Sequence, residues 1–256
     1  MKYTIITGAT SGIGYDLSKV FASNKHNLIL VSRNKEKLET IKHTLSKEYL
    51  IDVLIFTCDL SRSEEINNLC ENIISSKVQI EYLVNNAGVG SFGPFYKIPE
   101  NEDLNIIDLN IRSLTHMTKV FLPYFVEKNH GGILNVSSTA AFSPGPYMAV
   151  YYSSKAYVLS LTEALREEVK NKDIKISVLC PGPTDTNFQN NAKVKKADFA
   201  KKSMMDSSTV ATIAYDGFIK GKTIIIPGFN NKFLAFFSKI LPRKLLIKII
   251  SKVNGV

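Results

Sequence analysis

Two residues one helical turn apart carry the side chains best suited to acid–base chemistry in this chain of 256 residues. Tyr151 and Lys155 fall within a helical pattern, so both project from one face of a helix. An unperturbed tyrosine titrates at about pH 10, and a nearby ammonium favours its phenolate. Ser137 ends a predicted strand and Ser138 follows it, and either hydroxyl could hydrogen-bond an oxygen on which charge develops. The pattern predicts proton transfer at an oxygen, with Lys155 lowering the pKa of Tyr151.

A glycine-rich turn near the N-terminus predicts a phosphate site. It lies between a predicted strand that ends at Thr7 and a predicted helix that begins at Gly12, and its spacing is Gly-x-x-x-Gly-x-Gly. Glycines let the backbone approach a pyrophosphate closely, and the helix N-terminus offers free N–H groups and a positive dipole end. Taken alone, the turn could also be an ordinary strand-to-helix connection.

Short apolar runs alternate with longer amphipathic stretches, and this alternation must position both groups of residues. Strand patterns fall at residues 3–7, 27–32, 53–57, 81–84, 132–137, 175–179 and 223–226. Helical patterns fall between them at residues 12–24, 35–48, 64–75, 107–127, 151–171 and 207–220. Strands joined through helices are parallel, so we predict an α/β fold: a doubly wound, Rossmann-like parallel sheet of about seven strands. Ligands bind at the carboxyl ends of such strands.

Five motifs, in this order, resemble the signature of the short-chain dehydrogenase/reductase family. They are Thr7-Gly8-x-x-x-Gly12-x-Gly14, Asp59-Leu60, Asn85-Asn86-Ala87-Gly88, Ser138 with Tyr151-x-x-x-Lys155, and Pro181-Gly182-x-x-x-Thr186. The resemblance covers roughly residues 1–226 and implies an NAD(P)-dependent oxidoreductase that acts on a carbonyl or secondary alcohol. It implies that hydride passes between the nicotinamide and the substrate carbon while Tyr151 moves the proton.

The resemblance also implies roles for the matching residues. In the family the serine precedes the tyrosine by 13 positions, which selects Ser138 over Ser137. Asp59 and Leu60 would hold the adenine edge, and Thr186 would reach the nicotinamide carboxamide. A helical asparagine holds, through its backbone carbonyl, a water beside the lysine, so the implied catalytic residues are Asn110, Ser138, Tyr151 and Lys155. The implied cofactor-binding residues are Gly8, Thr10, Ser11, Gly12, Ile13, Gly14, Arg33, Asp59, Leu60, Asn86, Ala87, Gly88, Tyr151, Lys155, Pro181, Gly182, Thr184 and Thr186.

Arg33 stands where nucleotide-binding sheets choose between the two nicotinamide cofactors. An acidic residue at the end of the second strand binds the ribose 2′-hydroxyl and selects NAD, but this chain has Ser32-Arg33 there. A guanidinium suits planar, bidentate contacts with a 2′-phosphate, so we predict NADP(H) over NAD(H). A second family signal for NADP, a basic residue in the glycine turn, is absent because Ser11 occupies that place. The alternative is a solvated arginine that opens the next helix.

The net charge of +9 is concentrated near the C-terminus. Residues 193–256 hold 13 Lys and Arg against 3 Asp and Glu, which leaves −1 for the rest of the chain and argues against a nucleic-acid partner. We predict one catalytic domain at residues 1–228 and a basic extension at 229–256, divided by Pro242 into two short amphipathic helices. Four cations between residues 233 and 250 argue against a membrane-spanning helix. The extension is either a contact with an anionic membrane surface, or a lid and dimer contact.

Composition limits the remaining possibilities. Three cysteines without a CxxC pair or a neighbouring histidine predict neither a disulfide framework nor a metal site, and the N-terminal apolar run is too short for an export signal. We therefore expect a cytoplasmic protein, peripheral at a membrane if the extension binds there. The family resemblance implies a homodimer or homotetramer. Aromatic residues around the predicted site favour an apolar small-molecule substrate: Phe92, Phe95, Phe142, Tyr147, Phe188 and Phe199.

Two rival functions and the histidines complete the predictions. The chain could be a catalytically silent dinucleotide-binding regulatory or interaction protein on the same fold, although such a protein would be expected to lack Tyr151 or Lys155. It could also be a methyltransferase or an epimerase of the extended short-chain group, which the short length and the glycine spacing disfavour. The four histidines are expected to be structural or at the surface, with His26 and His43 on polar faces of the early helices.

Overall fold

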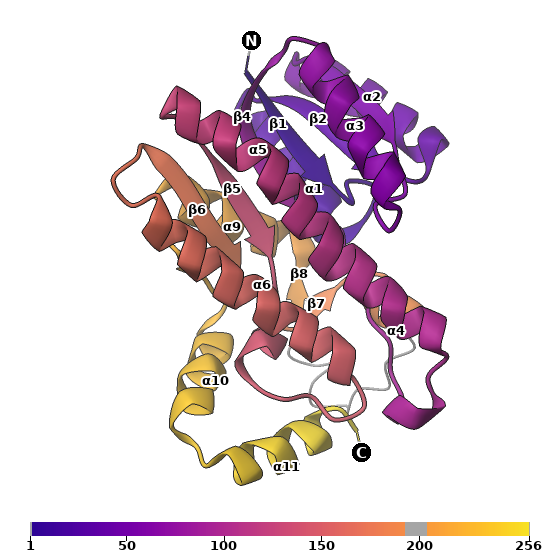
Figure 1. Ribbon diagram of the computed structural model, residues 1–256, viewed down its shortest axis with the longest axis vertical. Coiled ribbons are helices and arrows are strands. Elements are labelled where there is room, and N and C mark those ends of the chain that lie inside the picture. The colour runs from indigo at the N-terminus through magenta and orange to yellow at the C-terminus, as the bar shows by residue number, and fades with distance from the viewer. Residues whose placement is uncertain (1, 193–203, 256) are drawn as a thin grey trace.

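Seven parallel strands form one sheet at the centre of the structure. The computed structural model describes residues 2–192 and 204–255 of the chain. Its central strands are β1 (Lys2–Thr7), β2 (Asn27–Ser32), β3 (Val53–Thr57), β4 (Gln79–Asn85), β5 (Gly131–Val136), β6 (Ile174–Leu179) and β9 (Ile224–Ile225). They pair in the order β3-β2-β1-β4-β5-β6-β9, and every pair is parallel (Figure 1). The predicted doubly wound sheet is confirmed, and its strand order reverses between β1 and β4.

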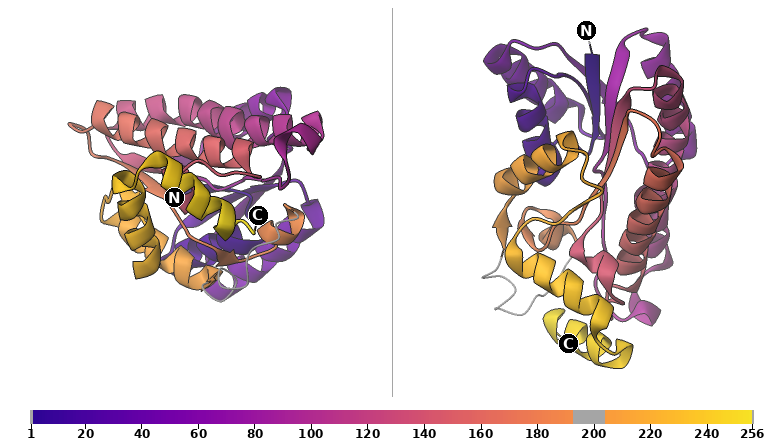
Figure 2. Two further views of the ribbon diagram at one scale, coloured as in Figure 1. Left: turned by 90° about the horizontal axis from the view of Figure 1, so that it is seen from below. Right: turned by 90° about the vertical axis from the view of Figure 1, so that its left-hand side faces the viewer.

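Helices cover both faces of this sheet (Figure 2). One face packs against α1 (Gly12–Ser23), α2 (Lys35–Tyr49) and α9 (Ser207–Ile219), and the other against α3 (Ser63–Ser75), α5 (Leu114–Lys128) and α6 (Ala149–Glu168). Phe21 and Phe218 fill the first core, and Phe121 and Phe125 fill the second. Because both faces are covered, β2 and β5 are buried along nearly their whole length. The layers hold the carboxyl ends of β1 and β4 side by side, at the position where ligands bind in such sheets.

The central helix and several short elements differ from the sequence prediction. α4 (Glu100–Ile107) begins after Pro99 and runs through a π-helical segment, η2 (Asp108–Ser113), into α5, whereas the prediction began at residue 107. The first turn is acidic and the π-helical turn interrupts the 3.6-residue period, so no apolar stripe marks this start. The shortest elements have no period to detect: β7 (Thr184–Asp185), β8 (Met205–Asp206), α7 (Phe188–Asn191), η1 (Phe95–Lys97) and η3 (Thr139–Phe142).

The last two helices lie outside these layers. α10 (Phe229–Ile240) and α11 (Arg243–Val253) are separated at Pro242, as predicted. Figures 1 and 2 place both helices beyond the carboxyl ends of the strands, at the opposite end of the molecule from the N-terminus. Within residues 2–192 and 204–255, no helix has the length and apolar content needed to cross a bilayer.

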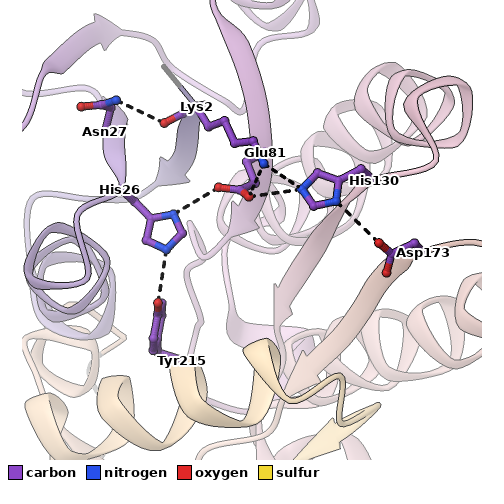
Figure 3. A network of polar contacts seen from close by, with 7 residues as sticks. All are labelled: Lys2, His26, Asn27, Glu81, His130, Asp173 and Tyr215. Carbon is purple, nitrogen blue, oxygen red and sulfur yellow. Dashed lines mark hydrogen bonds and ion pairs between the residues drawn. The ribbon is translucent and has the colours of Figure 1, made fainter.

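A polar network joins the amino ends of the strands, far from the predicted site (Figure 3). Glu81 in β4 lies 3.2 Å from Lys2 Nζ, 3.2 Å from His130 Nε2 and 3.5 Å from His26 Nδ1. The hydrogen bond with His26 is the largest cause that lowers the pKa of Glu81 to about 2, and those with His130 and Lys2 add to it against the effect of burial. His26 and His130 are therefore structural, although His26 lies in the turn after α1 rather than on a helix face.

Replacing Glu81 with glutamine is expected to destabilise the protein in a pH-dependent way. The folded-state pKa of Glu81 lies below its unfolded value of about 4.3, so the stabilisation is complete above that pH and is lost as the pH falls through the folded value. E81Q should lower the free energy of unfolding by about 2 kcal/mol at neutral pH and by less under acid conditions. Urea unfolding at about pH 7 and about pH 4 measures this, with the exposed Glu127→Gln as control. Equal losses at both pH values would contradict it.

Candidate active site

The glycine turn after β1 is packed tightly against the segment that follows β4. Gly8 and Gly12 adopt left-handed backbone conformations, with φ of 65° and 52°. A Cβ on Gly14 would lie 2.3 Å from Asn86 Nδ2 and 2.3 Å from the Gly8 carbonyl oxygen, so a larger residue does not fit. Asn86 Nδ2 also donates to the Thr7 carbonyl oxygen at 2.9 Å. The two segments thus form one cradle at the N-terminus of α1.

One cleft of about 420 Å³ opens at the carboxyl ends of the strands and contains nearly all the predicted site residues. Those that line it are Gly8, Thr10, Ser11, Gly12, Ile13, Arg33, Asp59, Leu60, Asn86, Ala87, Gly88, Ser138, Tyr151, Lys155, Pro181, Gly182, Thr184 and Thr186. The two that do not are Gly14, which packs against Gly8 and Asn86, and Asn110. The structure thus brings the residues predicted for cofactor binding and for catalysis into one cavity.

Tyr151 and Lys155 line this cleft from α6, with 9% and 5% of their surface exposed. Lys155 Nζ lies 5.7 Å from the centroid of the Tyr151 ring and donates to the Val136 carbonyl oxygen at 3.0 Å. Ser137 Oγ donates to the Lys155 carbonyl oxygen at 2.7 Å, whereas the Ser138 hydroxyl is close enough to Tyr151 to lower the pKa of the phenol. The geometry therefore favours Ser138 as the hydroxyl that acts beside the phenol.

Burial determines the pKa values of this pair. It raises the pKa of Tyr151 above its ordinary value, which the Ser138 hydroxyl opposes only in part. It also lowers the pKa of Lys155 to about 8. Burial dominates the pKa of Tyr151 in this structure, and Lys155 directs its ammonium at the Val136 carbonyl oxygen. The lowering of the Tyr151 pKa by Lys155 together with the positive ring of a bound cofactor stays a prediction. At neutral pH the phenol is protonated and can donate a proton.

Asn110 lies outside the cleft, in the π-helical segment, and ties together elements that surround the tyrosine. Its buried side-chain amide donates to the Val89 carbonyl oxygen at 2.9 Å and to Ser154 Oγ at 3.0 Å. Its Oδ1 accepts from the Val89 amide at 2.9 Å. These bonds hold the segment after β4 against α6. π-Helical segments are frequent at functional sites, and the implied role of the Asn110 carbonyl in holding a water stays a prediction.

Arg33 and Asp59 line the cleft from the ends of β2 and β3. Burial acts to raise the pKa of Asp59, but hydrogen bonds from Ser61, together with the charges of Arg33 and Arg62, lower it overall. The guanidinium of Arg33 is therefore close enough to act on Asp59. A guanidinium at the end of the second strand fits a 2′-phosphate, and the glycine cradle fits a pyrophosphate, so the residues present fit a bound dinucleotide.

Gly90 and Phe188 shape the cleft beside the tyrosine. The ring of Phe188 lies 5.2 Å from that of Tyr151. A Cβ on Gly90 would lie 2.9 Å from Phe188 Cζ and 3.2 Å from Tyr151 Cδ2, so a glycine there allows the two rings to meet. Phe188 was predicted from its aromatic character. Gly90 was not predicted as a site residue, and the only sequence feature that could have indicated it is its position shortly after Gly88.

The other predicted aromatic residues do not all contribute to the cleft. Phe92 and Tyr147 pack on each other with ring centroids 6.1 Å apart. Phe95 is 65% exposed on η1, and Phe142 lines a separate cleft beside α10 and β9, so neither side chain lines the cleft that contains Tyr151. Phe95 lies on a turn that projects into solvent, and Phe142 lies on η3, which α10 covers. Phe199 lies outside the described residues.

The last two helices form one wall of the cleft, the position that the lid alternative predicted for the extension would give them. Leu234 of α10 and Ile250 of α11 line it, as does Asn254 just after α11. Asn254 is buried, accepts from the Tyr152 hydroxyl at 3.1 Å and donates to the Pro146 carbonyl oxygen at 2.9 Å. These partners are 102 and 108 residues away in the chain, so their contact depends on the complete fold.

A phosphate cradle and a proton-donating tyrosine that share one cleft of a doubly wound sheet define a nucleotide-dependent oxidoreductase. The family model for short chain dehydrogenase matches residues 2–197, and the chain belongs to this family.

Known relatives agree with this assignment. The very-long-chain 3-oxoacyl-CoA reductase of Anas platyrhynchos is 28% identical over 256 residues, which cover 98% of this chain and 80% of the relative. The 17-beta-hydroxysteroid dehydrogenase type 3 of Mus musculus is 35% identical over 209 residues, which cover 79% of this chain and 68% of the relative. A solved short-chain dehydrogenase from Sphingobium yanoikuyae in complex with NADPH has 27% identity and a TM-score of 0.84, and the match covers 94% of this chain and 93% of that one. The first curated relatives are longer, since the chain spans 55% to 80% of their lengths.

Proposed function

We propose that the chain is an NADP(H)-dependent oxidoreductase that reduces an apolar ketone to a secondary alcohol. The observation that carries the proposal is the placement of Ser138, Tyr151 and Lys155 in the same cleft as the glycine cradle. The similarity to a 3-oxoacyl-CoA reductase and to a hydroxysteroid dehydrogenase supports an apolar carbonyl substrate. The NADPH bound by a structural neighbour supports the cofactor.

The proposed mechanism transfers one hydride and one proton. The glycine cradle and Arg33 would hold NADPH, which when bound would supply the hydride for the carbonyl carbon. As negative charge develops on the carbonyl oxygen, Ser138 donates a hydrogen bond to it and Tyr151 transfers its phenolic proton, which completes the alcohol. The charge of Lys155 then stabilises the phenolate until it takes a proton from water. Met148 and Phe188, packed around Tyr151, keep bulk water away from these steps.

Consumption of NADPH with a panel of ketones tests this function. The panel contains short aliphatic ketones, long-chain 3-oxoacyl thioesters, steroid ketones and, as polar controls, keto sugars. Turnover of at least one apolar ketone supports the proposal. NADPH binding without turnover of any member would favour the alternative, a catalytically silent dinucleotide-binding protein. The placement of both Tyr151 and Lys155 in the cleft favours the enzyme.

Replacing Arg33 with aspartate is expected to reverse the cofactor preference. The change removes the proposed phosphate contact and introduces an acceptor for a 2′-hydroxyl, so the KM for NADPH should rise by about 10- to 100-fold and the KM for NADH should fall. Steady-state kinetics with both cofactors measure this. Arg62→Asp is the control, because Arg62 pairs with Glu65 at 3.7 Å and does not line the cleft. If both variants behave alike, Arg33 does not read the phosphate.

We also propose that the protein is a homodimer or homotetramer in the cytoplasm. The family resemblance supports the oligomer. A reducing compartment is supported by Cys58, Cys70 and Cys180, which are free and buried. Burial raises the pKa of all three thiols, so they remain protonated and unreactive.

A further inference from the structure

The most apolar face of α10 points away from the protein. Phe229, Phe233, Phe236 and Ile240 are 79%, 54%, 60% and 63% exposed. Residues with this spacing share one face of a helix. The helix is held from its opposite side, where Ala235 is buried. The apolar stripe of a helix in a soluble domain normally faces the core, so this orientation indicates a partner.

α11 divides its apolar residues between the cleft and the outside. Leu246 and Ile250 are buried, and Ile250 lines the substrate cleft. Leu245 and Ile249 are 47% and 36% exposed. The next face of the helix carries exposed lysines: Lys244, Lys248 and Lys252. One helix thus closes the cleft with one side and adds to the outward apolar surface with the other.

Every charged residue in this part of the chain is basic. Residues 229–256 contain no Asp or Glu, and their cations are Lys232, Lys239, Arg243, Lys244, Lys248 and Lys252. All six are exposed, and none forms an ion pair with another residue in the described part of the chain. Exposed aromatic residues flanked by unpaired cations are complementary to a surface that is apolar inside and anionic outside.

This surface borders the mouth of the substrate cleft. Asn254 joins the end of α11 to the loop that contains Pro146 and Tyr147. The Gly93 amide donates to the Tyr147 carbonyl oxygen at 2.8 Å, which joins that loop to η1. Two more exposed aromatic residues stand on η1: Phe95 and Tyr96, at 65% and 83%. The exposed apolar residues therefore extend from the helices to the other side of the cleft.

An anionic bilayer fits this surface better than a second copy of the chain does. The helices have 12 and 11 residues, too few to span a membrane but suited to lie in its interface. A second copy would bring two sets of unpaired cations together. We propose that α10 and α11 dock the enzyme on an anionic lipid bilayer with the cleft mouth at its surface, so that apolar substrate enters from the lipid. The docking does not depend on the proposed function, whereas substrate entry from the lipid rests on it.

Vesicle sedimentation of the full chain tests the docking. Wild type should sediment with vesicles that contain phosphatidylserine and weakly with pure phosphatidylcholine. Removing three charges in K244Q/K248Q/K252Q should weaken binding about 100-fold. Removing the exposed rings in F229S/F233S/F236S should abolish binding. The matched control K47Q/K128Q/K172Q removes three exposed lysines elsewhere and should change binding less than about threefold. All of these residues are exposed, so we expect each variant to keep the fold.

Three outcomes would overturn the docking. The wild type does not sediment with either kind of vesicle, or it binds both lipids equally, or the control variant K47Q/K128Q/K172Q loses as much binding as K244Q/K248Q/K252Q. If the phenylalanine variant instead turns a dimer into a monomer without lipid, the surface joins two copies and the proposal is wrong.

Substrate entry has its own readout. K244Q/K248Q/K252Q should raise the KM for a ketone dissolved in vesicles and leave the KM for a soluble ketone unchanged. A parallel rise in both would overturn entry from the lipid. If no ketone is turned over at all, the proposed function fails while sedimentation still decides the docking.

Discussion

Replacing Tyr151 with phenylalanine is expected to lower kcat by about 10²- to 10⁴-fold, the range that general acid–base groups contribute. The change removes one hydroxyl and keeps a ring that packs against Phe188 and Met148. The affinity for NADPH, set mainly by the glycine cradle, should change less than about threefold. Steady-state ketone reduction and fluorescence titration with NADPH measure the two quantities separately.

The matched control is Tyr157→Phe on the same helix. Tyr157 is 38% exposed, and its hydroxyl is 2.9 Å from Thr115 Oγ1, away from the cleft. Its loss should leave kcat within about twofold. A Tyr151→Phe enzyme that keeps more than about a tenth of wild-type kcat would show that another group supplies the proton, and the mechanism would be wrong.

The sheet and the main site motifs could be predicted from the sequence because each has a local signal. A strand covered on both faces is a short apolar run, which identifies β2 from its own residues. The glycine turn follows from its spacing, and Tyr151 and Lys155 share a face because they are four residues apart. The parallel order then brings the strand ends together, which places these segments in one cleft.

The other features depend on distant parts of the chain. Asn254 reaches Tyr152 only after the whole sheet has formed between them. The spacing of Tyr151 and Lys155 suggests mutual attraction, but their pKa values depend on how deeply α6 is buried. The amphipathic pattern of α10 shows which residues form its apolar face, but it does not show whether that face points into the protein or into solvent. That face points outward because Ala235, rather than a phenylalanine, packs against the fold.

Replacing Lys155 with methionine is expected to lower kcat/KM at least 100-fold while making the protein more stable. A buried lysine whose pKa falls from 10.5 to about 8 keeps its charge at a cost on the order of 3 kcal/mol, which methionine avoids. Between about pH 8 and pH 10.5, Lys155 binds fewer protons in the folded state than in the unfolded state. Wild-type stability should therefore rise with pH across that window, and the advantage of K155M should shrink.

The activity of the wild type should change with pH in the opposite direction to its stability. Lys155 is charged below about pH 8 and neutral above it, so kcat/KM for ketone reduction should fall as the pH rises through that value. Lys155→Arg keeps the charge and should remove this fall while retaining part of the activity. If K155M shows the same alkaline decline as the wild type, the titrating group lies elsewhere. If K155M is less stable at neutral pH, the hydrogen bond from Lys155 to Val136 outweighs the cost of burying its charge.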